Sequence, residues 1–392
     1  MNKHKSNNNG LVVLVAGGTA GHINAAIALE KKFLENNFDV LFFSGKRPLD
    51  FKLFANKSVI HLDARPIKYK NPLKIIWSLY KNIVAFIKVL MTMYRLRPLL
   101  AIGAGGYICG PVLMAHYLLR IPFFIIEQNA VLGVTNKILL LFANKIFIHL
   151  KHTIGIPKFF NKKVIVSGNP IRSEFLTTNF NVCRRDKDNR EDEFAIVVFG
   201  GSLGATPIND LIEAFVSSLQ KNYDLNFKLR IKHQTGKRDI SSFPKRVENK
   251  DIIYQQLEYL DDICKEYCDH DFIICRSGAS TISELRYVRK PVILIPYPHH
   301  KDRHQFINAE SLKHEAEDAN SHSCFNVYIE DVVRLAENNF TLLKNIIRSN
   351  YSQRSQRSQC SNQNSQQSGL LLEMKDATEI IYNISTYSVF NK

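Results

Sequence analysis

Phe272 to Glu284, with the sequence FIICRSGASTISE, changes from an apolar run to a short polar turn and then to a helix-like segment. This order predicts a buried strand followed by the start of a helix. Such a helix points free backbone N–H groups at the carboxyl edge of a parallel sheet, where an anion can bind. Ser277, Ser280 and Thr281 add hydroxyl groups there, and Glu284 could bond ribose hydroxyls. The stretch predicts a nucleotide site, with an ordinary βα turn and a capping residue as the alternative.

Other glycine-rich turns follow apolar runs in the same way. Leu11 to Ala16 leads into GGTAGH at residues 17–22, Leu100 to Ile102 leads into GAGGY, and Phe194 to Phe199 leads into GGSLGA. A strand, a glycine-rich turn and a helix form the phosphate-binding opening of α/β domains. The polar residues Glu127-Gln128-Asn129 end a further buried strand, at the edge where parallel sheets place their ligands.

A dinucleotide-binding dehydrogenase is the first rival interpretation. The glycines do not read G-x-G-x-x-G, and the strand at Val40 to Phe43 ends in Ser44-Gly45-Lys46, with no acidic residue for the ribose of NAD. We therefore expect no cofactor.

Two patterns resemble metal sites only superficially. Asp186-x-Asp188 lies among basic residues in the charged run Cys183 to Glu193, which we interpret as a solvated linker. Cys264, Cys268 and His270 have no second ligand pair, so we assign them to the core or to a helix surface. We expect no metal site. The seven cysteines are odd in number and unlike a secreted disulfide framework, which indicates a reducing cytoplasm.

The order of elements predicts two doubly wound parallel-sheet α/β domains, and 392 residues with 45% hydrophobic residues suffice for two cores. We place an N-terminal domain at residues 1–168 and a C-terminal domain at residues 169–345. Residues 349–368 contain no aliphatic side chain and are predicted to be a disordered insert. Residues 370–392 are predicted to return as a helix, possibly to the N-terminal domain.

The net charge of +16 favours an acidic partner, namely anionic lipid, nucleic acid or a phosphorylated substrate. Leu73 to Leu96 has no acidic residue and carries Lys74, Lys81, Lys88 and Arg95 at intervals of seven, which form a basic stripe on a helix. The segment is too interrupted to span a bilayer, and its apolar arc is broad, so we expect it to lie on an anionic membrane surface. A buried helix with snorkelling lysines is the alternative.

Eight motifs in order make the chain from Leu11 to Ala309 resemble one family: GGTAGH, GAGGYICGP, EQNA, GNPIR, GGSLGA, HQTG, CRSGASTISE and HKDRHQFINA. The chain is similar to the family 28 N-acetylglucosaminyltransferases of peptidoglycan synthesis, which convert lipid I to lipid II. The resemblance implies a GT-B fold of two Rossmann-like domains. It implies inverting transfer from UDP-N-acetylglucosamine to the muramyl 4-hydroxyl of lipid I, by a peripheral enzyme at the cytoplasmic face of the inner membrane, with no nucleic-acid partner.

The resemblance also implies the site residues. Positions matching the family's substrate contacts are Thr19, Ala20, Gly21, Asn129, Arg172, Ser202, Leu260, Ala279, Ser280, Thr281, Ile282, Ser283, Glu284 and Gln305. Main-chain N–H groups, an arginine and helix N-termini suit a departing diphosphate that no metal neutralises. His22 is the candidate catalytic base, because neutral imidazole accepts a proton near pH 7, unless it only caps or orients the turn.

Four residues depart from the family pattern. Ala20 replaces a glycine, Ala25 a proline, Cys109 a serine and Ile126 a histidine. If the position of Ala20 requires a positive φ, the geometry of the turn changes.

Two other classes of function remain open at this point. One is a different inverting GT-B UDP-sugar transferase, or a UDP-sugar epimerase of the same fold. The other is a non-enzymatic basic protein that binds a membrane surface, which the net charge alone would suit.

Overall fold

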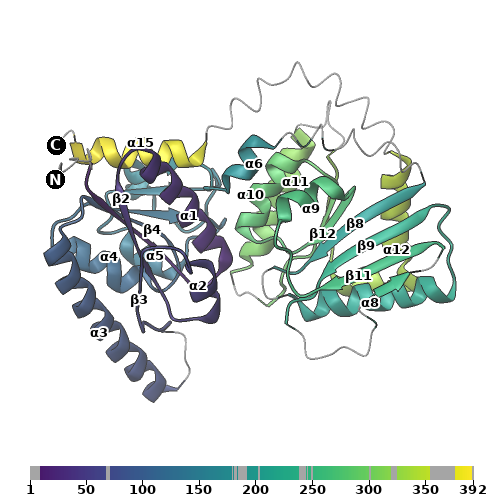
Figure 1. Ribbon diagram of the computed structural model, residues 1–392, viewed down its shortest axis with the longest axis horizontal. Helices are drawn as coiled ribbons and strands as arrows, with labels where there is room; N and C mark the ends of the chain where they lie inside the picture. The colour runs from purple at the N-terminus through teal and green to yellow at the C-terminus, as the bar shows by residue number, and fades with distance from the viewer. Residues whose placement is uncertain are drawn as a thin grey trace, which may run out of the picture. The chain divides into compact units, whose positions relative to one another are not determined.

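The computed structural model describes residues 9–67, 71–178, 180, 183, 192–201, 204–237, 244, 246–248, 250–299, 302–318, 325–353 and 376–390 (Figure 1). The chain forms two compact units, residues 1–173 together with 374–392, and residues 174–373. The sequence placed the boundary after residue 168. In the structure the first unit extends to Ser173, whose hydroxyl accepts a hydrogen bond from Lys31 of that unit over 3.0 Å.

The first unit contains a parallel sheet in the order β3-β2-β1-β4-β5-β6-β7. Its strands are β1 (Leu11–Ala16), β2 (Asp39–Ser44), β3 (Val59–His61), β4 (Leu100–Gly105), β5 (Phe123–Glu127), β6 (Lys145–Ile148) and β7 (Val164–Val166). β1 is apolar throughout and β5 is apolar up to its last residue, Glu127, as expected for a sheet with helices on both faces. The strand order reverses between β1 and β4, which is where doubly wound sheets bind ligands.

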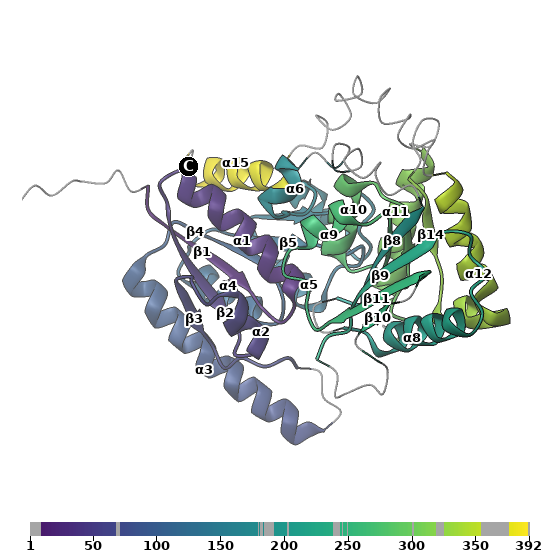
Figure 2. The ribbon, with the colours of Figure 1, turned by 45° about the vertical axis from the view of Figure 1, so that its right-hand side comes forward.

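Two helical layers cover this sheet. One face packs against α1 (Ala20–Glu35) and α15 (Ala377–Phe390), whose buried residues share one core with β1 and β4. The other packs against α3 (Pro72–Leu96), α4 (Cys109–Leu118), α5 (Val134–Leu139) and the 3₁₀ helix η1 (Lys158–Lys163). A short helix, α2 (Pro48–Leu53), follows β2. Figure 2 shows α15 lying beside α1.

The C-terminal segment packs on the first unit through aromatic and charged contacts. The Tyr382 ring lies 5.2 Å from that of Phe33 and 6.2 Å from that of Phe38, measured between centroids. Lys32 and Glu379 form an ion pair beside them. Residues 377–390 of the predicted returning segment thus form α15, while residues 370–375 lie outside the described part of the chain.

The second unit contains a sheet in the order β10-β11-β9-β8-β12-β13-β14, parallel except for the edge strand β10. Its strands are β8 (Glu193–Phe199), β9 (Lys228–Gln234), β10 (Arg246–Glu248), β11 (Ile252–Leu257), β12 (Phe272–Cys275), β13 (Val292–Leu294) and β14 (Val327–Ile329). Its helices are α8 (Thr206–Lys221), α9 (Ile263–Asp269), α10 (Ala279–Val288), α11 (His304–Asp318) and α12 (Val332–Ser352), and α6 (Ser173–Thr177) lies at the junction of the units. The order reverses between β8 and β12.

The prediction that residues 349–368 are disordered is wrong for the first four residues. Residues 349–352 belong to α12, and Asn350 is fully buried, with its side-chain amide donating to the Ile346 carbonyl over 2.8 Å. The Tyr351 ring stacks on Phe227 at 3.9 Å. The absence of aliphatic side chains was misleading because an aromatic ring and a bonded amide can also pack in a core. Residues 354–368 lie outside the described part of the chain.

Helix α3 presents large apolar side chains to the surface. Ser78, Ala85, Val89 and Met93 face the core of the first unit and are buried. Exposed apolar residues on α3 include Leu73, Ile76, Trp77, Tyr80, Ile83, Ile87, Met91 and Tyr94, at 47 to 74% exposure. Within the described residues, α3 alone is long and apolar enough to cross a bilayer by length and composition. A span would surround the helix with lipid, whereas one face of α3 is committed to the core of its own domain.

Candidate functional site

The first glycine turn lies at the carboxyl end of β1, at the switch point of the sheet. Thr19 is the N-cap of α1, and its hydroxyl accepts a long hydrogen bond of 3.5 Å from the His22 backbone N–H. Ala20 and Gly21 are the first two residues of α1. The left-handed φ of +89° falls on Gly18, and Ala20 is not among the residues with positive φ. The substitution at Ala20 therefore introduces no backbone strain.

His22 lies between the ends of β1 and β4. A Cβ atom added at Gly105 would be 2.6 Å from the imidazole Cδ2, so the ring packs directly on the bare backbone of β4. Nδ1 of His22 lies 3.3 Å from the Gly17 carbonyl oxygen. A carbonyl only accepts hydrogen bonds, so in the neutral ring Nδ1 carries the proton and Nε2 keeps a lone pair.

The environment of His22 favours the neutral ring. Burial lowers the pKa of His22 below its usual 6.5, against the smaller opposing effects of the Gly17 carbonyl and the Glu127 carboxylate. A ring that is neutral at pH 7, with Nε2 unprotonated, can accept a proton from a hydroxyl group. The geometry therefore suits a general base.

Asn129 is held by Glu127, a residue whose role the sequence did not predict. The Glu127 carboxylate is buried and accepts from the Asn129 backbone N–H at 3.0 Å and side-chain amide at 3.3 Å. Its other oxygen accepts from the Gly133 N–H at 2.8 Å and the Asn136 amide at 3.0 Å. Four donors occupy this carboxylate, so Glu127 positions the loop rather than binding a ligand itself. The sequence feature that could have indicated this role is the position of Glu127 at the end of a buried strand, two residues before Asn129.

A second positioning pair, Arg47 and Asp50, was missed in the sequence. The buried Asp50 carboxylate accepts from the Gly18 N–H and the Arg47 N–H, both at 3.1 Å. The Arg47 guanidinium donates to the Gly18 carbonyl over 3.1 Å and lies over the Tyr107 ring. The two residues clamp the glycine turn from α2. Both residues lie about thirty positions after Gly18 in the chain, and no sequence pattern connects them to it.

The other three departures from the family pattern fit the fold. The buried Cys109 thiol donates to the Val15 carbonyl over 3.7 Å, and burial raises the pKa of Cys109 to about 12, so the thiol keeps its proton. Ile126 is fully buried in the sheet. Ala25 lies inside α1 rather than at its start.

In the second unit, the predicted nucleotide stretch forms β12, a turn and α10. The N-cap residue Gly278 has extended backbone geometry and no side chain that could bond the free N–H groups of Ala279, Ser280 and Thr281. The Ser277 hydroxyl is fully buried and has no hydrogen-bond partner among the described residues. The free first turn of α10 is therefore available to an anion.

Glu284 lies on the same helix and is half-buried. The Tyr267 hydroxyl donates to its Oε2 over 3.2 Å. Ile282 is fully buried in the core, and the buried Ser283 hydroxyl donates to the Ala279 carbonyl over 2.8 Å. The Ile282 side chain and the Ser283 hydroxyl thus lie inside the protein, and the Ile282 N–H donates to the Gly278 carbonyl over 2.9 Å.

The end of β13 lies beside α10 and α11. Oε1 of Gln305 accepts from the Tyr297 N–H over 2.9 Å. Arg276 donates to the carbonyls of Ile295 and Pro296, both at 3.0 Å, and the Asn308 amide donates to the Ser277 carbonyl over 3.2 Å. Arg276 therefore fixes the loop after β13, a structural role the sequence did not reveal.

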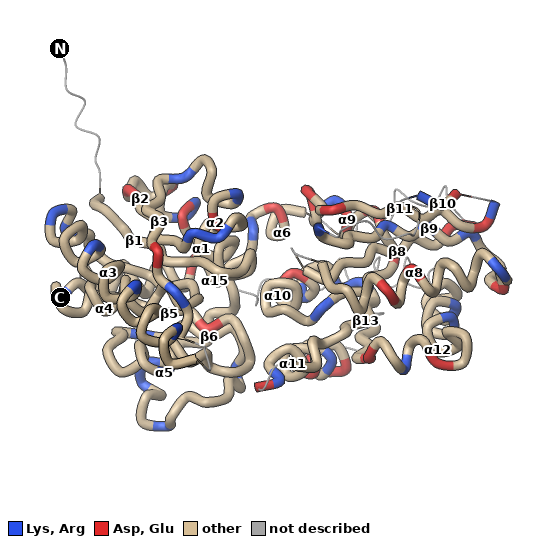
Figure 3. The backbone as a smooth tube through the Cα atoms, turned by 90° about the horizontal axis from the view of Figure 1, so that it is seen from below, with Lys and Arg blue, Asp and Glu red and all other residues tan. Residues whose placement is uncertain are grey.

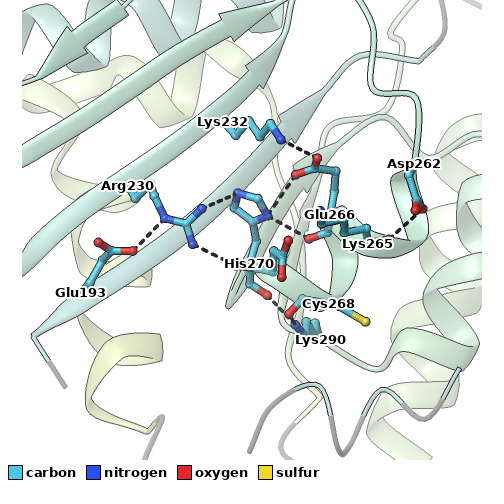
Figure 4. A network of polar contacts seen from close by, with 10 residues as sticks. Glu193, Arg230, Lys232, Asp262, Lys265, Glu266, Cys268, His270 and Lys290 are labelled. Carbon is cyan, nitrogen blue, oxygen red and sulfur yellow. Dashed lines mark hydrogen bonds and ion pairs between the residues drawn. The ribbon is translucent and has the colours of Figure 1, made fainter. Parts of the chain in front are cut away.

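Leu260 precedes α9, a helix that a polar network attaches to the sheet (Figure 4). Leu260 is buried at 6% exposure. Lys232 of β9 donates to Glu266, and Nδ1 of His270 lies 2.8 Å from the Glu266 carbonyl. Asp262 caps α9 by accepting from the Lys265 N–H. Cys268 and His270 thus belong to a structural network, and the described residues contain no cluster of metal-ligand side chains.

The predicted site residues fall into two groups. Thr19, Ala20, Gly21, His22 and Asn129 lie at the carboxyl edge of the first sheet, and Leu260, Ala279 to Glu284 and Gln305 lie in the second unit. Arg172 follows β7 and belongs to the first unit, although the sequence assigned it to the C-terminal domain. Ser202 lies outside the described residues.

Two doubly wound units with helix N-termini at both switch points define a GT-B protein. A crystal structure of MurG from Acinetobacter baumannii has the same fold, with a TM-score of 0.64 and 23% identity over 90% of this chain and 93% of that one. Residues 12–148 match the glycosyltransferase family 28 N-terminal domain, and residues 195–370 match its C-terminal domain. The chain belongs to glycosyltransferase family 28.

Relatives in this family carry a specific name. A protein of Myxococcus xanthus is 35% identical over 77% of both chains, and one of Geotalea uraniireducens is 36% identical over 77% of this chain and 82% of its own. Both are named UDP-N-acetylglucosamine–N-acetylmuramyl-(pentapeptide) pyrophosphoryl-undecaprenol N-acetylglucosamine transferase.

Proposed function

We propose that this glycosyltransferase transfers N-acetylglucosamine from UDP-N-acetylglucosamine to the muramyl 4-hydroxyl of lipid I, which gives lipid II. The names of the relatives, at 35 and 36% identity, carry this proposal. In the reaction the acceptor oxygen forms a bond to C1 of the donor sugar as the bond from C1 to the diphosphate breaks. The configuration at C1 inverts, and UDP leaves.

Each group of residues has a role in this reaction. His22 takes the proton of the acceptor hydroxyl on Nε2, and Thr19, Ala20, Gly21 and Asn129 bind the donor from the first unit. The N–H groups that begin α10 and the glycine turn after β8 bind the diphosphate, and Glu284 bonds the ribose hydroxyls. Arg172 and Gln305 bind the donor as well. The step needs no metal, because backbone dipoles and an arginine stabilise the negative charge of the leaving group.

We further propose that the first unit binds the cytoplasmic face of the inner membrane through α3. Its exposed apolar residues include Ile76, Tyr80 and Ile83, and Lys74 and Lys88 are exposed near them. Figure 3 shows basic residues along α3. Apolar side chains at the head-group level and lysines beside anionic lipid hold a peripheral helix. Such binding brings the acceptor site to a lipid-anchored substrate.

A UDP-release assay with purified protein tests the reaction. We expect UDP to be released from UDP-N-acetylglucosamine only when lipid I is present, and lipid II to accumulate in equal amount. Calorimetric titration with UDP-N-acetylglucosamine, UDP-glucose and UDP-galactose tests the donor, and we expect the first to bind most tightly. Conversion of the donor sugar without any acceptor would instead identify a UDP-sugar epimerase.

A further inference from the structure

The end of β9, His233-Gln234-Thr235, carries a buried chain of hydrogen bonds that the proposed reaction does not use. His233 is fully buried. Its Nδ1 lies 3.0 Å from the Tyr254 hydroxyl and its Nε2 lies 3.1 Å from Oδ1 of Asn209. The Asn209 amide nitrogen donates to the Thr235 carbonyl over 2.9 Å, and Gln256 donates to the Tyr254 hydroxyl oxygen over 2.8 Å.

The direction of every bond in this chain follows from its ends. The Thr235 carbonyl can only accept, so the Asn209 NH₂ group faces it and the Asn209 oxygen faces His233. Nε2 of His233 must then carry the proton, which leaves Nδ1 to accept from the Tyr254 hydroxyl. One neutral tautomer of His233 therefore satisfies all the partners in the chain.

This chain ends at Gly201 and Gly204, two of the described residues of the glycine turn that follows β8. A Cβ atom on Gly204, whose φ is +76°, would lie 1.9 Å from the Thr235 carbonyl oxygen, so the turn rests directly on that peptide. The Gln234 side chain donates to the Gly201 carbonyl over 3.0 Å. The Gly204 N–H donates to the same carbonyl over 2.9 Å. Gln234 and Thr235 thus contact Gly201 and Gly204 of this turn directly.

We propose that His233 is a positioning residue for donor binding. It holds Asn209 and the Thr235 peptide in place, and through them it fixes the glycine turn that meets the donor diphosphate. The inference rests on the proposed function, because that function makes this turn part of the donor site. Groups that bind a ligand must be held by partners with fixed geometry, and a chain with one hydrogen-bond direction provides this.

The test compares two substitutions of His233. Glutamine can accept at one atom and donate at another with a spacing similar to that of the imidazole nitrogens, whereas leucine can do neither. For His233→Leu we expect the Kd for UDP-N-acetylglucosamine to rise about ten-fold, the equivalent of one lost hydrogen bond. The donor KM should rise with it while the acceptor KM stays unchanged. For His233→Gln we expect a Kd within about three-fold of wild type.

Two further variants separate positioning from stability. Tyr254→Phe removes the hydroxyl that donates a hydrogen bond to Nδ1 of His233, so it should also raise the Kd for UDP-N-acetylglucosamine. This variant provides the test if His233→Leu does not fold. Tyr223→Phe is the control, because it deletes a partly buried tyrosine hydroxyl of the same unit, bonded to the Phe227 carbonyl just before β9 begins. Its donor Kd should equal that of wild type. Melting temperatures are measured for the wild type and all four variants.

The outcomes distinguish this inference from the proposed function. A folded His233→Leu protein with wild-type donor affinity would overturn the positioning role. An equal loss of affinity in Tyr223→Phe, or in His233→Gln, would also overturn it, since affinity would then follow stability or packing alone. Failure of the wild-type protein to bind UDP-N-acetylglucosamine would instead overturn the proposed function.

Discussion

The hydroxyl of Tyr267, on α9, donates a hydrogen bond of 3.2 Å to Oε2 of Glu284, on α10. This bond restrains one oxygen of the carboxylate from a neighbouring helix. A restrained carboxylate loses less conformational freedom when it binds ribose hydroxyls.

Glu284→Ala should weaken UDP-N-acetylglucosamine binding by roughly 1.5 to 3 kcal/mol, the range of a hydrogen bond to a charged group. Calorimetric titration measures the change. Tyr267→Phe should weaken binding by a smaller amount, because the carboxylate remains. Glu317→Ala, at an exposed position on α11, is the matched control and should leave the affinity unchanged. Unchanged affinity in Glu284→Ala would refute the ribose role.

His22→Ala should reduce turnover by about 100-fold or more, because the acceptor hydroxyl loses its base. Donor affinity should be nearly retained, since most of the proposed donor contacts lie in the second unit and His22 acts on the acceptor hydroxyl. Steady-state kinetics with lipid I, together with titration of the donor, measure both quantities. If turnover survives the substitution, another group is the base.

The pH dependence follows from the environment of the same ring. Burial lowers the pKa of His22 below 6.5, so the ring loses its basic form only at a pH below that value. The acid limb of kcat/KM should therefore lie below pH 6.5, with activity constant from there to pH 7.5. Rates measured from pH 4.5 to 8 check this. An acid limb above pH 6.5 would exclude His22 as the titrating base.

Glu127→Gln should destabilise the first unit and weaken donor binding through Asn129. An amide presents an NH₂ group to N–H donors that now face a carboxylate oxygen, so at least one buried donor loses its acceptor. The expected cost is about 1 to 3 kcal/mol in the free energy of unfolding, measured by urea denaturation. The donor Kd should rise, because Asn129 is a proposed donor contact and loses its support. Glu35→Gln, at an exposed position of α1, is the control.

The structure changes which lysines of α3 are suitable for testing membrane binding. Lys81 is one of the lysines spaced seven apart on α3, but its Nζ lies 2.8 Å from Oδ2 of Asp63 and 4.9 Å from the centre of the Trp77 ring. Reversing Lys81 would break these contacts, so the test uses Lys74 and Lys88, which are exposed. The double change to Glu should weaken binding to anionic vesicles by about 2 kcal/mol or more, since each lysine contributes about 1 kcal/mol.

Vesicle sedimentation at low and high salt measures this binding. Donor affinity should stay the same in the double variant. Lys221→Glu with Lys250→Glu makes the same change in net charge on exposed residues of the second unit and should leave vesicle binding intact. Equal binding by wild type and the α3 variant would place the membrane surface elsewhere.

Local patterns in the sequence were sufficient to predict the central strands and their glycine turns, but not β3, β10, β11 and β14. β1, β8 and β12 are short apolar runs that end in glycine or polar residues, and a strand buried on both faces requires such a run. The α/β class follows because these runs alternate with helices. The location of the candidate site residues after the strand ends could also be predicted, since parallel strands bring their carboxyl ends to one edge of the sheet.

The sequence by itself therefore determined the two doubly wound units, the glycine turns and the helix starts that carry His22 and Glu284. Only the tertiary structure decided which side chains bind and which position others. Glu127 was read as part of a ligand-binding edge, but four donors occupy its carboxylate. Asp50 reaches Gly18, and Asp63 pairs with Lys81, across separations with no sequence signal. A hydrogen bond depends on where a side chain points in space, which distant parts of the chain set by packing.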